Sequence, residues 1–126
     1  GDDVKVILME AKEDHPFVQV ELMMPILPLV RVPDVDQAIE MAVRVEHGNR
    51  HTAMMHSRNV EKLTKMAKLI QTRIFVKNGP SYAGIGVGGE GYTTFTIAGP
   101  TGEGLTSAKS FARRRRCVLV GGMDVR

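Results

Sequence analysis

Cysteine, aromatic residues and long apolar runs are scarce in this sequence. Tryptophan is missing from the 126 residues and cysteine occurs once, at Cys117, so an internal disulfide is excluded and a reducing compartment is expected. No stretch reaches the roughly eighteen consecutive apolar residues that a membrane-spanning helix needs, so we expect no membrane partner. The four histidines form no His-Glu-x-x-His motif, and no metal site is predicted. What is present is 43% apolar residues, enough for one ordinary soluble domain.

The net charge of +3 is concentrated in four consecutive arginines, residues 113–116. No aromatic residues accompany them for stacking on bases, so we expect no nucleic-acid partner. Successive strand residues alternate between faces, and the arginines run directly into apolar residues, so we interpret them as the polar start of a strand near a subunit or domain contact. A basic nucleic-acid-binding domain stays as an alternative, which a salt-dependent gel shift would test.

The apolar residues alternate between strand and helix patterns. Asp34 predicts the start of one helix, because Gln37 follows three residues later and apolar residues then recur at helical spacing. Asn59 predicts the start of a second helix with a similar apolar face. Runs of β-branched and apolar residues predict strands, and Pro28 places one of them at an edge or a bulge. The predicted strands are residues 4–9, 26–32, 51–56 and 73–77.

This order predicts an α/β fold in which flanking helices cover a layered, mostly parallel sheet with right-handed crossovers. Beyond residue 78 the pattern changes to a glycine-rich segment, and no repeat or linker divides the chain, so we expect one unit over residues 1–126. The remaining predicted elements are a strand at 93–98, a helical turn at 105–111 and a final strand at 114–120.

Small residues dominate residues 78–104. Glycine costs roughly 0.5–1 kcal/mol relative to alanine in regular structure, so packing or ligand contact must offset that loss. Aromatic residues such as Tyr82 and Phe95 are interleaved, which favours a segment lying against another surface over a flexible linker. The glycines from Gly84 to Gly89 match the dinucleotide-binding pattern by letter, but no predicted strand ends there and no predicted helix follows, so a Rossmann loop is not expected.

Four sequence segments occur in an order that resembles one enzyme family. They occupy residues 51–57, 74–84, 88–104 and 115–120. Together they resemble the C-terminal part of CoA-acylating aldehyde dehydrogenases, and the nearest branch is the propionaldehyde dehydrogenases of bacterial propanediol-utilisation microcompartments. The resemblance covers essentially the whole chain. It implies that residues 1–126 are the C-terminal portion of the catalytic domain, with the terminal strand near the oligomerisation surface.

The resemblance implies NAD-dependent oxidation of an aldehyde, propionaldehyde in the nearest branch, with transfer of the acyl group to coenzyme A. In that family a cysteine thiolate attacks the aldehyde, the hemithioacetal loses hydride to NAD+, and the thioester passes to coenzyme A. Cys117 does not match the nucleophile's motif, so the nucleophile and the nucleotide-binding domain are expected upstream and the isolated chain is expected to be inactive. The competing interpretation is a non-catalytic interaction or assembly module.

The same resemblance implies the partners and the location of the chain. The partners are the aldehyde, coenzyme A, the remainder of the enzyme and further copies of it in a homo-oligomer. The expected location is the bacterial cytoplasm or the lumen of a microcompartment.

Two kinds of site residue are carried over from the family. Glu21 is similar to the glutamate that binds the ribose hydroxyls of the nicotinamide half, although Met23 and Met24 replace the usual phenylalanine and glycine before Pro25. A carboxylate suits that role because it accepts hydrogen bonds from two neighbouring hydroxyls.

His51 resembles the histidine that acylating members hold near the active cysteine, where a group that titrates near neutrality can assist proton transfer or the incoming thiol. A structural, hydrogen-bonded histidine is the alternative. The loop that begins at Asn78 resembles the segment that lines the aldehyde tunnel, and the implied wall residues are Asn78, Pro80, Ser81 and Tyr82.

Overall fold

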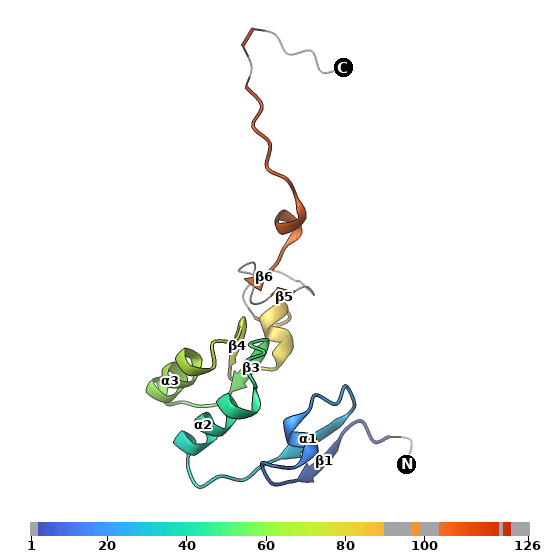
Figure 1. The fold of residues 1–126 in the computed structure, drawn as a ribbon, viewed down its shortest axis with the longest axis vertical. Helices are drawn as coiled ribbons and strands as arrows, with labels where there is room; N and C mark the ends of the chain where they lie inside the picture. The colour runs from blue at the N-terminus through green and yellow to red at the C-terminus, as the bar shows by residue number, and fades with distance from the viewer. Residues whose placement is uncertain (1–2, 90–96, 99–103, 119, 122–126) are drawn as a thin grey trace.

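Helices and paired strands alternate along the chain in a computed structural model that describes residues 3–89, 97–98, 104–118 and 120–121 (Figure 1). The strands of the described part are β1 (Ile7–Glu10), β2 (Ile26–Leu29), β3 (Thr52–Met55), β4 (Ile74–Lys77), β5 (Ile97–Ala98) and β6 (Gly104–Leu105). The helices are α1 (Pro16–Gln19), α2 (Val35–Val45) and α3 (Val60–Ile70), with 3₁₀ turns η1 (Ser81–Ile85) and η2 (Ala108–Phe111).

The predicted α/β class is confirmed, with parallel pairs β1–β2 and β3–β4 and an antiparallel pair β5–β6. The prediction that residues 26–32 and 51–56 join one sheet is wrong, because the described strands form three separate pairs. Strand β2 finds its partner in β1, where Pro28 lies opposite Met9. Proline has no N–H to donate, which suits the edge position that the sequence indicated.

Both predicted helix starts are confirmed. The Asp34 carboxylate accepts a hydrogen bond from the Gln37 N–H at 2.9 Å, and the Asn59 side chain accepts one from the Lys62 N–H at 3.1 Å. These caps satisfy donors that the first turn of a helix leaves unpaired. After α2 the backbone takes positive φ at Gly48, a conformation that glycine adopts readily at the end of a helix.

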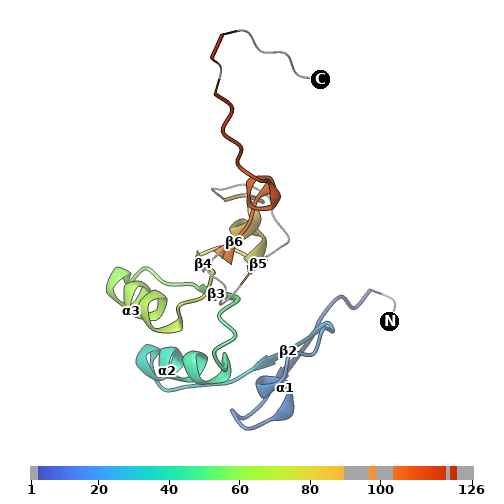
Figure 2. The same ribbon diagram turned by 45° about the horizontal axis from the view of Figure 1, so that its top comes forward.

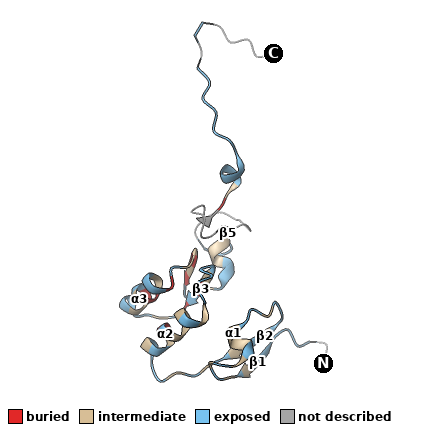
Figure 3. Ribbon diagram, in the orientation of Figure 1, coloured by how far each residue is buried: buried red, intermediate tan, exposed pale blue. Residues whose placement is uncertain are grey.

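One hydrophobic core lies between the two long helices and the strand pair β3–β4, and Figure 3 shows its buried residues gathered where α3 meets β3. Ile39 of α2 is its most buried residue, at 1% exposure. By contrast, β1 and β2 contain no fully buried residue. The remaining members of the core cluster are Ala53, Met55, Leu63, Met66 and Ile70.

An ion-pair cluster joins α2 to α3 at the surface. The Asp36 carboxylate accepts hydrogen bonds from Lys62 Nζ at 2.7 Å and Lys65 Nζ at 2.8 Å. These bonds favour the charged carboxylate and lower the pKa of Asp36 to about 2 from its ordinary 3.8. The pKa of Lys65 is raised by the same contact.

Asp36→Asn is expected to make the free energy of unfolding depend less steeply on pH below about pH 4. Because the folded pKa lies below the unfolded one, the Asp36 contribution is present above about pH 4 and is lost as the pH falls towards 2. Urea unfolding at several pH values between 5 and 2 measures this. Asp14→Asn, which removes an exposed carboxylate that makes no ion pair in the described part of the chain, should leave the slope unchanged. An unchanged slope in Asp36→Asn would contradict the assignment.

The C-terminal elements differ from their prediction. The helical turn is η2, shorter than residues 105–111, and Leu105 belongs to β6. Of the predicted final strand over residues 114–120, residue 119 lies outside the described residues; residues 114–118 and 120 form no strand and are exposed. Figures 1 and 2 show this segment running away from the helices. Of the predicted strand 93–98, residues 93–96 lie outside the described residues and 97–98 are β5. Within the described residues no helix is long and apolar enough to span a membrane.

Candidate functional site

A cavity of about 710 Å³ lies between the end of α1 and the start of β3. One wall comes from residues 18–21, and the opposite wall from the end of α2 through β3. η1 closes a third side with Ser81. The cavity therefore unites three of the residues carried over by the resemblance, which are Glu21, His51 and Ser81. The other lining residues are 18–20, 45–47, 49, 52 and 54.

The first wall is set by the short helix α1. The His15 ring caps this helix, because its Nδ1 accepts a hydrogen bond from the Phe17 N–H at 3.1 Å, and Pro16 occupies the first helical position. The Gln19 side chain donates to the Glu13 carbonyl at 2.5 Å. The chain then leaves the helix in extended conformation at Val20 and presents the exposed Glu21.

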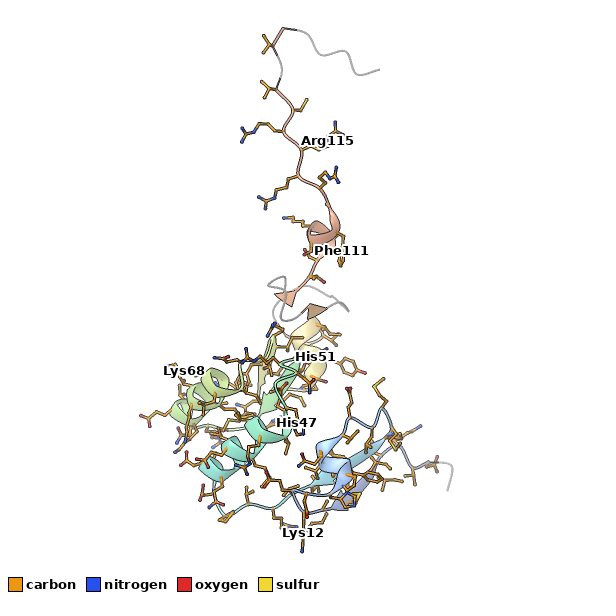
Figure 4. All side chains as sticks on the ribbon, in the orientation of Figure 1. Lys12, His47, His51, Lys68, Phe111 and Arg115 are labelled. Carbon is orange, nitrogen blue, oxygen red and sulfur yellow. The ribbon has the colours of Figure 1, made fainter. Side chains whose placement is uncertain are left out.

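His51 stands on the second wall, immediately before β3. Its carbonyl accepts a hydrogen bond from the Ile74 N–H at 3.1 Å, so the parallel ladder fixes its backbone. Its ring Nδ1 lies 2.7 Å from the Thr52 hydroxyl. Because Nδ1 is engaged there, Nε2 is the ring nitrogen left for a ligand. Figure 4 labels His51 at the start of β3 and His47 beyond the end of α2.

The predicted loop residues do not all line the cavity. Ser81 does, whereas Pro80 is the exposed cap of η1 and Tyr82 is exposed without lining it. Asn78 is not a lining residue either, and its side-chain amide bonds to the backbone of Ser57. The structure thus brings together Glu21, His51 and Ser81 and leaves the other three beside the site.

Several lining residues were missed from the sequence. Gln19, His47, Asn49 and Thr52 add polar side chains to the cavity. Thr52 had a usable signal, because it follows His51 directly. The other three line the cavity because residues 18–21 lie across from residues 45–54, an arrangement that a local sequence pattern does not predict. Among the described residues no group of three potential metal ligands converges.

One ion pair links the two walls. The Glu13 carboxylate binds Arg44 in a bidentate manner, with Arg44 Nε at 2.9 Å and a terminal nitrogen at 3.1 Å. This contact lowers the pKa of Glu13 and raises the pKa of Arg44. Within the described residues no other hydrogen bond or ion pair crosses from residues 3–32 to residues 35–89.

The cavity offers complementary chemistry on its walls. Glu21 supplies a carboxylate acceptor for hydroxyl donors, and His51 supplies an imidazole whose ring nitrogens can donate or accept a hydrogen bond. Ser81 adds a hydroxyl that can donate or accept. Such a site can bind a polyhydroxylated ligand on one wall and move a proton at the other.

Residues 5–102 match the model of the aldehyde dehydrogenase family, and the chain belongs to that family. It is 59% identical over 122 residues to a propanal dehydrogenase (CoA-propanoylating) of Citrobacter freundii, covering 97% of this chain and 26% of that protein. It is 78% identical to Rhodopseudomonas palustris propionaldehyde dehydrogenase solved with bound CoA and an acylated cysteine, at a TM-score of 0.86. An engineered glycolyl-CoA reductase with bound NADP+ is also 78% identical, at a TM-score of 0.85. Both structural matches cover 92% of this chain and 26% of the other.

Proposed function

We propose that this chain is the C-terminal part of the catalytic domain of an NAD-dependent, CoA-acylating aldehyde dehydrogenase. The reaction converts an aldehyde, coenzyme A and NAD+ into an acyl-CoA and NADH, with propionaldehyde as the aldehyde. The names of the relatives support this class, because one is a CoA-propanoylating dehydrogenase and another was solved with bound CoA. The chain spans 26% of the length of these relatives, so the activity is proposed for the complete enzyme.

The observation that carries the proposal is the shared cavity of Glu21 and His51. In this proposal Glu21 accepts hydrogen bonds from the ribose hydroxyls of the nicotinamide half, and His51 assists proton transfer as the acyl group passes to the thiol of coenzyme A. Ser81 forms a wall of the aldehyde path, and Asn78, Pro80 and Tyr82 complete that loop.

The nucleophilic cysteine belongs, in this proposal, to the part of the enzyme upstream of this chain. Cys117 is exposed on the extended segment beyond η2, whereas the cavity is lined by residues within 18–21 and 45–54 and by Ser81. The chain alone is therefore expected to be inactive.

The remainder of the enzyme is a proposed partner of the β1–β2 pair. Ile7, Leu8 and Leu27 are each more than half exposed, and burying them against further chain would be favourable. We also propose a homo-oligomer in the bacterial cytoplasm or in a microcompartment lumen. The alternative, a non-catalytic interaction module, would use the same exposed face and would leave the complete protein without turnover.

Glu21→Gln in the complete enzyme tests the proposed function. NADH formation is followed with propionaldehyde, coenzyme A and NAD+. Because the variant loses a charge-assisted acceptor, its KM for NAD+ should rise about tenfold while the KM for coenzyme A stays unchanged. Glu61→Gln, on α3 and away from the cavity, is the matched control. Absence of acyl-CoA formation by the unmodified enzyme would overturn the function, and turnover by the isolated chain would overturn the placement of the nucleophile.

A further inference from the structure

Asn78 occupies an unusual position at the end of β4. Its backbone N–H donates to the Met55 carbonyl at 3.0 Å, which is the last backbone bond between this end of β4 and β3. Its side-chain amide then bonds to both backbone groups of Ser57. Oδ1 accepts from the Ser57 N–H at 2.7 Å, and Nδ2 donates to the Ser57 carbonyl at 3.0 Å.

The Asn78 side chain thus takes the place of a further backbone step in the ladder. A primary amide offers one acceptor and one donor on the same plane, as a peptide unit does. Because the side chain satisfies Ser57, the main chain can leave the sheet at Asn78 without stranding the N–H and C=O of its neighbour. The chain turns away at once, with φ 55° at Asn78, and continues through Gly79 and Pro80 into η1.

Two requirements meet at this residue. The left-handed backbone conformation favours glycine, asparagine and aspartate over other residues. Simultaneous donation and acceptance by the side chain requires an amide. Among the residues that tolerate positive φ, asparagine satisfies both conditions.

The far end of the loop is anchored as well. Gly84 in η1 lies against Ile74 of β4, and a side-chain carbon at Gly84 would clash with the Ile74 Cγ2 methyl. The path of residues 79–83 is therefore fixed at both ends, by the Asn78 amide before it and the Gly84 contact behind it. Ser81 lies between these anchors and reaches the cavity that His51 lines.

We propose that Asn78 is a positioning residue, whose amide clasp on Ser57 holds the loop that carries Ser81 against the cavity, and that it does not itself contact the aldehyde. This inference rests on the proposed function for the identity of the ligand. The clasp itself rests on the hydrogen bonds between Asn78 and Ser57.

Two substitutions at Asn78 separate the requirement for positive φ from the requirement for a side-chain amide. Asn78→Asp keeps the size and the tolerance of positive φ, but its carboxylate has no donor for the Ser57 carbonyl. Asn78→Gly keeps the backbone freedom and removes both side-chain bonds, and it serves where the aspartate variant fails to fold. Asn59→Asp is the matched control, because the Asn59 side chain acts as an acceptor for Lys62 and aspartate caps a helix equally well.

The experiment combines hydrogen exchange with kinetics on the complete enzyme. Both Asn78 variants should raise the amide exchange rates of residues 79 and 81–85 about tenfold, and the control should not. The KM for propionaldehyde should rise about tenfold in the same variants, with a smaller change in kcat. A higher KM without faster exchange would mean that Asn78 contacts the aldehyde, and unchanged exchange and KM would remove any role. Either result overturns the proposal.

The two readouts also separate this inference from the proposed function. Faster loop exchange in an enzyme that converts no aldehyde would support the clasp and remove the proposed function. Unchanged loop exchange in Asn78 variants of an enzyme that does convert the aldehyde would remove the role of Asn78 and support the proposed function.

Discussion

Replacing His51 by alanine in the complete enzyme is expected to lower acyl transfer to coenzyme A by about 100-fold or more. Proton transfer by a positioned side chain typically contributes factors of this size, and His51 lines the cavity with its Nδ1 held 2.7 Å from the Thr52 hydroxyl. The measurement is the rate of acyl-CoA formation under saturating aldehyde and NAD+.

His56→Ala is the matched control for this result. His56 is also exposed and follows the other end of β3, but it does not line the cavity. Its replacement should leave the rate unchanged. Equal rates in His51→Ala and the unmodified enzyme would show that His51 is a structural histidine, the alternative that its sequence context left open.

Ile39→Ala is expected to reduce the free energy of unfolding by about 3 kcal/mol. Ile39 is 1% exposed at the centre of the core between α2, α3 and β3, and removing a buried isoleucine side chain typically costs 2–5 kcal/mol, depending on how far the cavity collapses. Urea unfolding followed by circular dichroism gives the change from the shift in midpoint.

Val60→Ala, at the start of α3, provides the comparison because Val60 is 66% exposed. Its substitution should change the free energy of unfolding by less than about 0.5 kcal/mol. A comparable loss in both variants would contradict the assignment of the core to the α2–α3–β3 interface.

The helices could be predicted from local chemistry because their signals are contained within a few residues. Asp34 with Gln37 and Asn59 with Lys62 are caps that operate over three positions, and both are present. Strand pairing could not be predicted in the same way, since it depends on which distant segment lies alongside. The sequence pattern of residues 26–32 is the same whether they pair with residues 7–10 or with residues 52–55. The apolar residues near Val118 likewise looked like a strand, but a strand needs a neighbour, and the described chain supplies none there.

The candidate site was predictable only as far as the family resemblance extended. Glu21 and His51 lie within sequence segments that resemble the family's, and both residues line the cavity. Asn78 also lies within a segment that resembles the family's. Its hydrogen bonds to Ser57, however, result from the register of β3 and β4, which brings together two residues that are 21 positions apart in the sequence. Sequence similarity identifies the residue, and the three-dimensional structure shows what its amide binds. The roles of all the site residues stay predictions until the variants are measured.

The ion pair between Glu13 and Arg44 has a consequence for how the cavity responds to salt. Both side chains are reached by solvent, at 35% and 57% exposure, and dissolved ions weaken such pairs. Among the described residues this is the one ion pair between residues 3–32 and residues 35–89, so we expect concentrated salt to weaken the attachment between the two walls of the cavity. The spacing of the two walls is therefore expected to depend on the ionic strength of the solution.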